Sequence, residues 1–228
     1  MTYGVRLSSW AAVEIDMAKK KTAKRGQPRG SLSLERIQRT ALELIEKQGL
    51  PAFSQRALAR ELGVEAMSLY HWYPSQLDLF NGLLDRVLQD LHVPKSGTPA
   101  ERLRAAAHAF RAIARRYPSF VGGFVLLHRF NTERGLRVLQ DMLEPFHDAG
   151  LRGEHAALRF RAWMHFMMGA LLDETLGYTK GPGATRPLPE AELAEKFPLV
   201  VALGPYNKAA HHEAFFDFGL EAVLAGLD

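Results

Sequence analysis

The stretch from Gln55 to Gln76 constrains the fold more than any other part of the chain. It reads QRALARELGVEAMSLYHWYPSQ and places two short helical patterns on either side of Gly63-Val64. Pro74 prevents the second helix from extending, because proline lacks a backbone donor and disfavours a helical residue before it. Two helices joined by a turn of a few residues that contains glycine are typical of a helix-turn-helix motif.

The flanking sequence predicts the remaining helices of this region. Ser33 is a candidate N-cap for a first helix that Gly49 and Pro51 end, and Ser54 is a candidate N-cap for the second. The third is expected over about 65–72. A fourth is expected over about 75–91, with an apolar stripe of Leu77, Phe80, Leu83, Leu84, Val87, Leu88 and Leu91.

The third helix is short in the way that a DNA-reading helix has to be. Such a helix lies in a major groove about 12 Å wide and presents hydrogen-bonding groups and apolar contacts there. The residues that match this demand are Ala66, Met67, Ser68, Tyr70 and His71. Spacing alone leaves a second interpretation open, in which Met67, Tyr70, Trp72 and Tyr73 are core residues.

Charge and turn residues divide the chain into three parts. The segment KKKTAKRGQPR, residues 19–29, holds six basic side chains and no acid, so it cannot fold alone and is either a solvated tail or an arm that reaches phosphates. We expect residues 1–29 to be a disordered extension with a basic arm, whether translation starts at Met1 or at Met17. Residues 30–92 are expected to form the helix-turn-helix domain and residues 93–228 a larger helical domain, because HVPKSGTP breaks the pattern.

The larger domain is predicted to be helical throughout, which makes the chain all-α. A capping box at Thr98 opens a helix that ends at Tyr117, and further helices are expected over about 119–128, 132–148, 154–178, 190–203 and 208–226. The helix over 154–178 and the segment AFFDFGLEAVLAGL mix large and small apolar residues. This permits close helix approach, either between two copies of the chain or within the core of one.

Two segments of this domain predict a deformable apolar pocket. SFVGGFVLLHRF and RAWMHFMMGALLDE combine methionine and aromatic residues with an occasional histidine. The candidate ligand-binding residues are Phe120, Phe124, His128, Trp163, His165 and Met168. The alternative is that these side chains are ordinary core.

Several classes of protein are excluded or disfavoured. The absence of cysteine excludes disulfides and thiolate sites, and there is no nucleotide-binding or nucleophile-elbow motif, so no enzymatic activity is expected. No histidine pair has metal-ligand spacing on one helix, so neither a metal nor a cofactor is expected. No apolar run approaches the roughly 20 residues of a membrane helix, and the start lacks a signal peptide, which favours a cytoplasmic protein.

The run LARELGVEAMSLYHWYPSQLDLF makes a more specific identification possible. It resembles the DNA-binding domain of the tetracycline-repressor-like (TetR) family of transcription factors, over about Ser33 to Leu91. The resemblance implies an N-terminal three-helix DNA-binding domain and a helical C-terminal domain for dimerisation and ligand binding. It also implies repression of an operator in double-stranded DNA that a small molecule relieves.

The resemblance also implies roles for individual residues. Arg56 would contact guanine, Gln55 and Tyr70 would contact phosphates, and Gln76 stands where the family usually has a lysine phosphate contact. The side chains that would face base edges are Ala66, Met67, Ser68 and His71. The hypothesis is a homodimeric repressor of a palindromic operator, released by a lipophilic or aromatic effector. The alternative is an all-helical small-molecule-binding or enzymatic protein whose N-terminal domain is a protein-interaction bundle.

Overall fold

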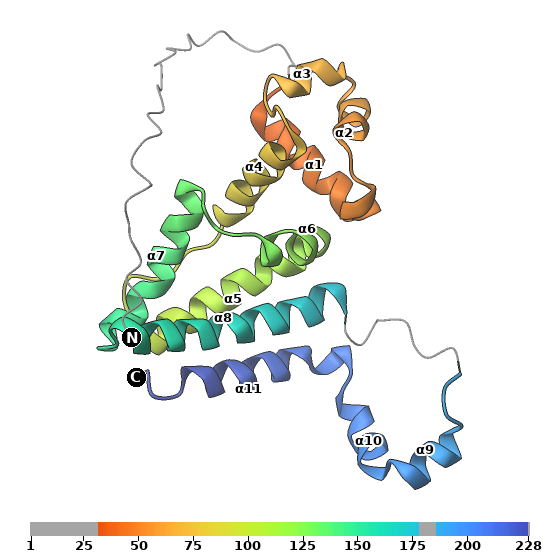
Figure 1. The fold of residues 1–228 in the computed structure, drawn as a ribbon, viewed down its shortest axis with the longest axis vertical. Helices are drawn as coiled ribbons and strands as arrows, with labels where there is room; N and C mark the ends of the chain where they lie inside the picture. Colours follow the sequence, from red (N-terminus) through yellow and green to blue (C-terminus); the bar gives the residue numbers. More distant parts are fainter. Residues whose placement is uncertain (1–31, 178–185, 228) are drawn as a thin grey trace, which may run out of the picture. The chain divides into compact units, whose positions relative to one another are not determined.

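The structure is a computed structural model that describes residues 32–177 and 186–227, and within these ranges all regular structure is helical (Figure 1). The all-α fold expected from the sequence is confirmed. The N-terminal elements are α1 (Leu34–Gln48), the short 3₁₀ helix η1 (Leu50–Ala52), α2 (Gln55–Leu62), α3 (Ala66–Tyr70) and α4 (Gln76–Leu88). The next elements are α5 (Pro99–Arg116), α6 (Pro118–Gly123), η2 (Val125–Leu127), α7 (Glu133–Asp148) and α8 (Gly153–Leu176). The last elements are α9 (Glu190–Lys196), α10 (Pro198–Leu203), η4 (Gly204–Tyr206), η5 (Ala209–His211) and α11 (His212–Leu224).

Local capping sets the bounds of the N-terminal helices. The Ser33 and Ser54 hydroxyls accept hydrogen bonds from backbone N–H groups in the first turns of α1 and α2, as the sequence predicts. Gly63 ends α2 with φ of 69°, a left-handed conformation that glycine adopts at little cost. The helix-turn-helix geometry therefore follows from residues at and beside the turn.

The buried face of α4 differs from the expected stripe at one position. Leu77 is 55% exposed, whereas Leu79 is 1% exposed and takes a place in the core. The two residues are about 200° apart around the helix, since each residue turns an α-helix by about 100°. The buried positions Leu79, Phe80, Leu83, Leu84, Val87 and Leu88 form one continuous face.

The C-terminal helices pack mainly on α5 and α8. The helix α5 contacts α6, α7, α8 and α11, while α8 and α11 lie side by side (Figure 1). The helix expected over 119–128 is divided at Phe124 into α6 and η2. The helix over 190–203 is interrupted at Phe197 before Pro198, where the proline is expected to break it. None of the described helices is both long and apolar enough to cross a membrane.

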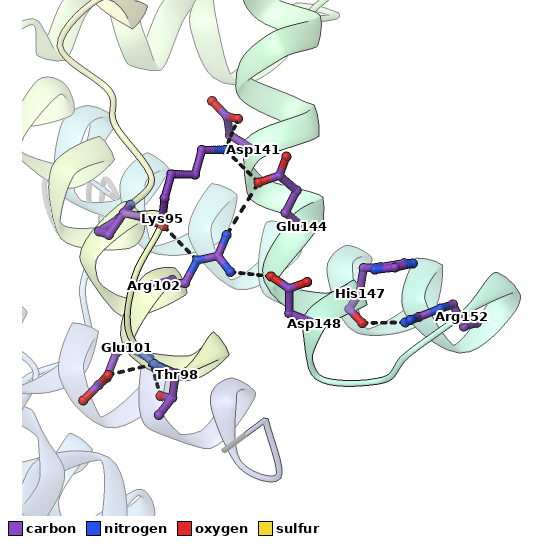
Figure 2. Close-up of polar contacts among 10 residues, drawn as sticks. Lys95, Thr98, Glu101, Arg102, Asp141, Glu144, His147, Asp148 and Arg152 are labelled. Atoms are coloured by element: carbon purple, nitrogen blue, oxygen red, sulfur yellow. Dashed lines mark hydrogen bonds and ion pairs between the residues drawn. The ribbon is translucent and has the colours of Figure 1, made fainter.

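A polar cluster fixes the connector that follows α4 (Figure 2). Arg102 is 5% exposed, and its Nε donates to the Pro94 carbonyl at 2.7 Å while its other nitrogens pair with Asp148 and Glu144 on α7. Lys95 in the connector pairs with Asp141 and Glu144 of the same helix, at 2.7 Å each. The chain leaving α4 is thereby attached to α5 and α7.

A second cluster attaches α8 and α11 to α5. Arg111 is 2% exposed and lies 2.7 Å from Glu174 of α8 and 3.0 Å from Glu213 of α11, while Arg115 contacts the same two carboxylates. Burial alone would raise the pKa of Glu174, but hydrogen bonds from both arginines outweigh it and the pKa is lowered. This part of the fold depends on an ionised glutamate.

We expect Glu174→Gln to lower the free energy of unfolding at pH 7 by about 1 to 2 kcal/mol, the size of a charge-assisted hydrogen bond in a partly exposed site. Because the folded pKa of Glu174 lies below its ordinary value of 4.5, its contribution is present above that pH and is lost as the pH falls through the folded pKa. Urea unfolding should therefore show a difference in unfolding free energy between the two proteins that shrinks as the pH falls below 4.5. Glu192→Gln, which removes only a pair with Lys196 within α9, is the control and should show no such difference. A difference in unfolding free energy that does not change with pH would contradict a stabilising role for ionised Glu174.

Candidate nucleic-acid interface and effector cavity

The exposed face of α3 is apolar and uncharged. Leu69 is 1% exposed and anchors the helix, while Met67 is 67% exposed and Tyr70 is 38% exposed. His71 is also exposed, and Ala66 and Ser68 are half-buried. The core interpretation holds for Tyr73, which is 8% exposed, but it fails for Met67 and Trp72. The exposed face of α3 therefore does not cover the core. Its residue types are those that suit contact with base edges in a groove.

The structure corrects the role expected of Gln55. Its side chain is buried, and its Nε2 donates to the backbone carbonyls of Tyr73 at 3.2 Å and Ser75 at 3.1 Å. The amide is therefore committed inside the protein and does not offer a donor to phosphate. It joins the start of α2 to the turn between α3 and α4, which fixes the direction of α3.

A second brace joins the same turn to α1 and α4. The Gln38 amide donates to the Tyr73 hydroxyl at 2.9 Å and to the Gly82 carbonyl at 3.1 Å. A Cβ at Gly82 would lie 2.6 Å from the Tyr73 ring, so only glycine leaves room for this side chain. Burial raises the pKa of Tyr73, against the opposing effect of the Gln38 amide, and the hydroxyl stays protonated. The four N-terminal helices are held as one block.

Two predicted DNA contacts remain available on the surface. Arg56, in the first turn of α2, is exposed and forms no hydrogen bond or ion pair with any described residue. Gln76, the first residue of α4, is exposed as well. The basic arm over 19–29 lies outside the residues that the structure describes, so its role stays a prediction.

A cavity of about 230 Å³ lies between η2, the loop that follows it, and one face of α8. Arg161, Met164 and Met168 supply the α8 wall at intervals of three and four residues, which places them on the same side of the helix. His128, Arg129 and Phe130 supply the loop wall. The remaining lining residues are Phe110, Val125, Leu126, Leu127 and Leu139.

The structure separates the six residues expected to line one pocket. His128 and Met168 line this cavity, and Phe124 stacks on His128 with ring centroids 4.4 Å apart. Phe120 and Trp163 have no exposed surface and belong to the core. His165 lines a different hollow of about 410 Å³ between α8 and α11. The expectation of a single pocket fails because Trp163 lies about 200° around α8 from Arg161, and His165 lies about 100° from Met164, on the side of α8 that faces α11.

A direct contact links α6, the helix that precedes η2, to the N-terminal helices. The Glu46 carboxylate, near the end of α1, accepts hydrogen bonds from the backbone N–H groups of Ser119 and Phe120, both at 2.9 Å. These groups belong to the first turn of α6, where helical donors lack partners and negative charge is favourable. Phe120 also meets Phe80 of α4, with ring centroids 6.1 Å apart. A shift of α6 would therefore change contacts with both α1 and α4.

Comparison with known proteins assigns this arrangement to a family. Residues 37–83 match the family model of bacterial regulatory proteins of the tetR family, and residues 93–228 match that of the tetracyclin repressor-like C-terminal domain. The chain belongs to the TetR family. It is thus a TetR-family transcriptional repressor with a helix-turn-helix DNA-binding region, as the resemblance in its sequence implied.

Individual TetR proteins match over different parts of the chain. The tetracycline repressor protein class D of Escherichia coli is 26% identical over 86% of this chain and 89% of its own length. The transcriptional repressor DrrR1 of Streptomyces coeruleorubidus is 34% identical over 94 residues, which are 40% of this chain and 35% of that protein.

Solved structures of TetR proteins share the fold. A possible TetR family regulator from Streptomyces coelicolor A3(2) has a TM-score of 0.70 at 27% identity, over 86% of this chain and 98% of that one. ActR from Streptomyces coelicolor, in complex with actinorhodin, has a TM-score of 0.68 at 25% identity, over 86% and 97% of the two chains. A TetR-family structure neighbour thus binds a small molecule.

One group of side chains in this TetR protein has the spacing of metal ligands. Ligand atoms of His108 on α5 and of Glu213 and Asp217 on α11 lie within 4.8 Å of one another among the described residues, and all three are exposed. Glu213 is already paired with Arg111 and Arg115, which hold its pKa below the ordinary range. A metal ion would have to displace these cations, so the group is better explained as part of the cluster on α5.

Sequence reasoning missed two sets of residues in this TetR protein. The first is the brace in which Gln38 contacts Tyr73 and Gly82, which lie 35 and 44 residues after it in the sequence. The second is the pair of arginines at the cavity, Arg129 and Arg161. The interval of three and four residues from Arg161 to Met168 is the one signal that could have found the second set.

Proposed function

We propose that this protein is a ligand-responsive repressor that binds a palindromic operator as a homodimer and is released by a small lipophilic or aromatic effector. The observation that carries the proposal is the exposed, uncharged face of α3, held in place by buried polar contacts behind it. Such a face is unfavourable in water but suited to base edges, where Met67 and Ala66 can meet thymine methyl groups and Ser68 and His71 can hydrogen-bond.

Arg56 and Tyr70 complete this surface. Arg56, in the first turn of α2, has no hydrogen-bond or ion-pair partner among the described residues, which suits a bidentate contact with guanine. Tyr70 and Gln76 are both exposed and would contact phosphates. The basic residues of 19–29 would add sequence-independent attraction to the DNA backbone.

Exposed apolar surface on the C-terminal helices supports the homodimer. Phe218 on α11 is 81% exposed, Leu176 on α8 is 58% exposed, and α8 and α11 are neighbours. Leu199 and Leu203 of α10 are 76% and 63% exposed. Surfaces of this kind mark protein interfaces, and a twofold axis would let the same surface on a second copy cover them.

The cavity beside η2 supports the effector. It is lined mainly by aliphatic, aromatic and methionine side chains, and it adjoins α6, which Glu46 and Phe80 connect to the DNA-binding helices. An effector that displaces η2 or α6 would change the position of α1 and α4. The complex of ActR with actinorhodin and the tetracycline repressors support control by a small molecule.

Selection of bound duplexes from a random DNA pool tests the proposal. We expect an inverted repeat whose half-sites are separated by about one helical turn, roughly 34 Å, or a multiple of it. Sedimentation of the selected complex should show an even number of chains per duplex. Recovery of no enriched sequence, with weak and uniform DNA affinity at physiological salt, would contradict the proposal and favour a small-molecule-binding protein. An enriched site without symmetry, bound by one chain, would contradict the homodimer.

A further inference from the structure

The polar side chains that line the cavity beside η2 are all basic. Its lining includes His128, Arg129 and Arg161 but no aspartate or glutamate. Arg161 comes from α8 and Arg129 from the loop between η2 and α7, so two elements far apart in the sequence bring basic side chains to one hollow.

Neither guanidinium has a partner among the described residues. No hydrogen bond, ion pair or ring contact joins Arg129 or Arg161 to another side chain there. The arginines on α5 behave differently, since Arg102, Arg104, Arg111 and Arg115 all pair with carboxylates. Two positive charges without counter-ions therefore border an apolar cavity.

The apolar walls limit the shape of what can enter. The rings of Phe124 and His128 are stacked, 21° from parallel, so the ring of His128 forms part of a flat surface. Met164 and Met168 on the facing wall have flexible side chains that adapt to a ligand. The volume of about 230 Å³ is below the range of roughly 300 to 1,000 Å³ of drug-sized sites, which favours a body of one or two fused rings.

We propose that the ligand of this cavity is a flat aromatic carboxylate whose anionic group is bound by Arg129 and Arg161. The ring system enters between His128, which Phe124 supports from behind, and the two methionines, while the carboxylate stays at the exposed arginines. Guanidinium groups match a carboxylate geometrically and are always charged, so both gain the counter-ion that the protein does not supply. The proposal rests on the cavity being the effector site, and it adds the chemical class of the effector.

Calorimetric titration of the full-length protein with 2-naphthoate and with its neutral isostere 2-naphthamide tests this proposal. We expect 2-naphthoate to bind at least about tenfold more tightly, because one charge-assisted hydrogen bond supplies that factor. Arg161→Gln combined with Arg129→Gln should make the two affinities equal. Arg134→Gln combined with Arg137→Gln is the matched control, since both arginines are exposed on α7, the two substitutions remove the same total charge, and neither residue lines the cavity.

Three outcomes would overturn the proposal: equal affinities in the wild-type protein, a preference for the carboxylate that survives in the double variant, and binding of neither compound at millimolar concentration. The titration contains no DNA, so its result is separate from that of the proposed function. A protein that binds 2-naphthoate through these arginines but selects no DNA would fail as a repressor and still confirm the ligand class.

Discussion

Arg102→Ala is expected to lower the free energy of unfolding by about 2 to 4 kcal/mol. The side chain is 5% exposed and donates to the Pro94 carbonyl while pairing with Asp148 and Glu144. Its removal leaves an unsatisfied carbonyl, Asp148 without its cation, Glu144 with Lys95 alone, and a cavity in the packing. Losses above this range are typical of fully buried ion pairs, whereas the carboxylates of this cluster are partly exposed.

Urea unfolding followed by circular dichroism measures this effect. Arg102→Lys should lose most of the same stability, because an ammonium group cannot contact the carbonyl and both acids in the planar arrangement of a guanidinium. Arg137→Ala is the control, since Arg137 is an exposed residue of α7 paired only with Glu133 one turn away, and it should change the stability by less than about 0.5 kcal/mol. An Arg102→Ala protein as stable as the control would show that the connector is not held by this cluster.

The fold was largely predictable because the residues that begin and end its helices act locally. Ser33, Ser54, Thr98 and Gly63 act on the helices beside them, so a window of a few residues contains the whole interaction. The bounds of α5 and the break before Pro198 follow in the same way.

The roles of single residues depend on distant contacts and were less predictable. Gln55 looks like a surface residue at the start of a helix, and only the return of the chain at Tyr73 and Ser75 shows that its amide is used internally. Likewise, Glu46 caps α6 across more than 70 residues of sequence. No local pattern contains both partners of such a contact.

The cavity was only partly predictable for a different reason. The helix α8 has apolar side chains on every side, as the run AWMHFMMGALL shows, so its sequence does not single out one face. Trp163 and Met168 are equally plausible pocket residues until packing buries the first and leaves the second half-exposed. Two of the six expected residues line the cavity, and the arginines beside them were missed.

Met67→Glu is expected to reduce affinity for a selected operator duplex at least about 100-fold. In the proposed complex the new carboxylate would enter a major groove bordered by phosphates and would lose its hydration there without gaining a partner. The free protein should fold normally, because Met67 is 67% exposed and surface substitutions change stability by about 0.5 kcal/mol or less. Leu136→Glu, at a residue of α7 that is 55% exposed, makes the same change of charge away from α3.

Fluorescence anisotropy of the labelled operator duplex, titrated with the wild-type protein and both variants at one salt concentration, tests the central claim that α3 is the DNA-reading surface. We expect the Leu136→Glu protein to bind within a few-fold of wild type and the Met67→Glu protein to bind the operator no better than a scrambled duplex of the same length, with all three proteins equally stable to urea. Undiminished operator binding by the Met67→Glu protein would contradict the claim.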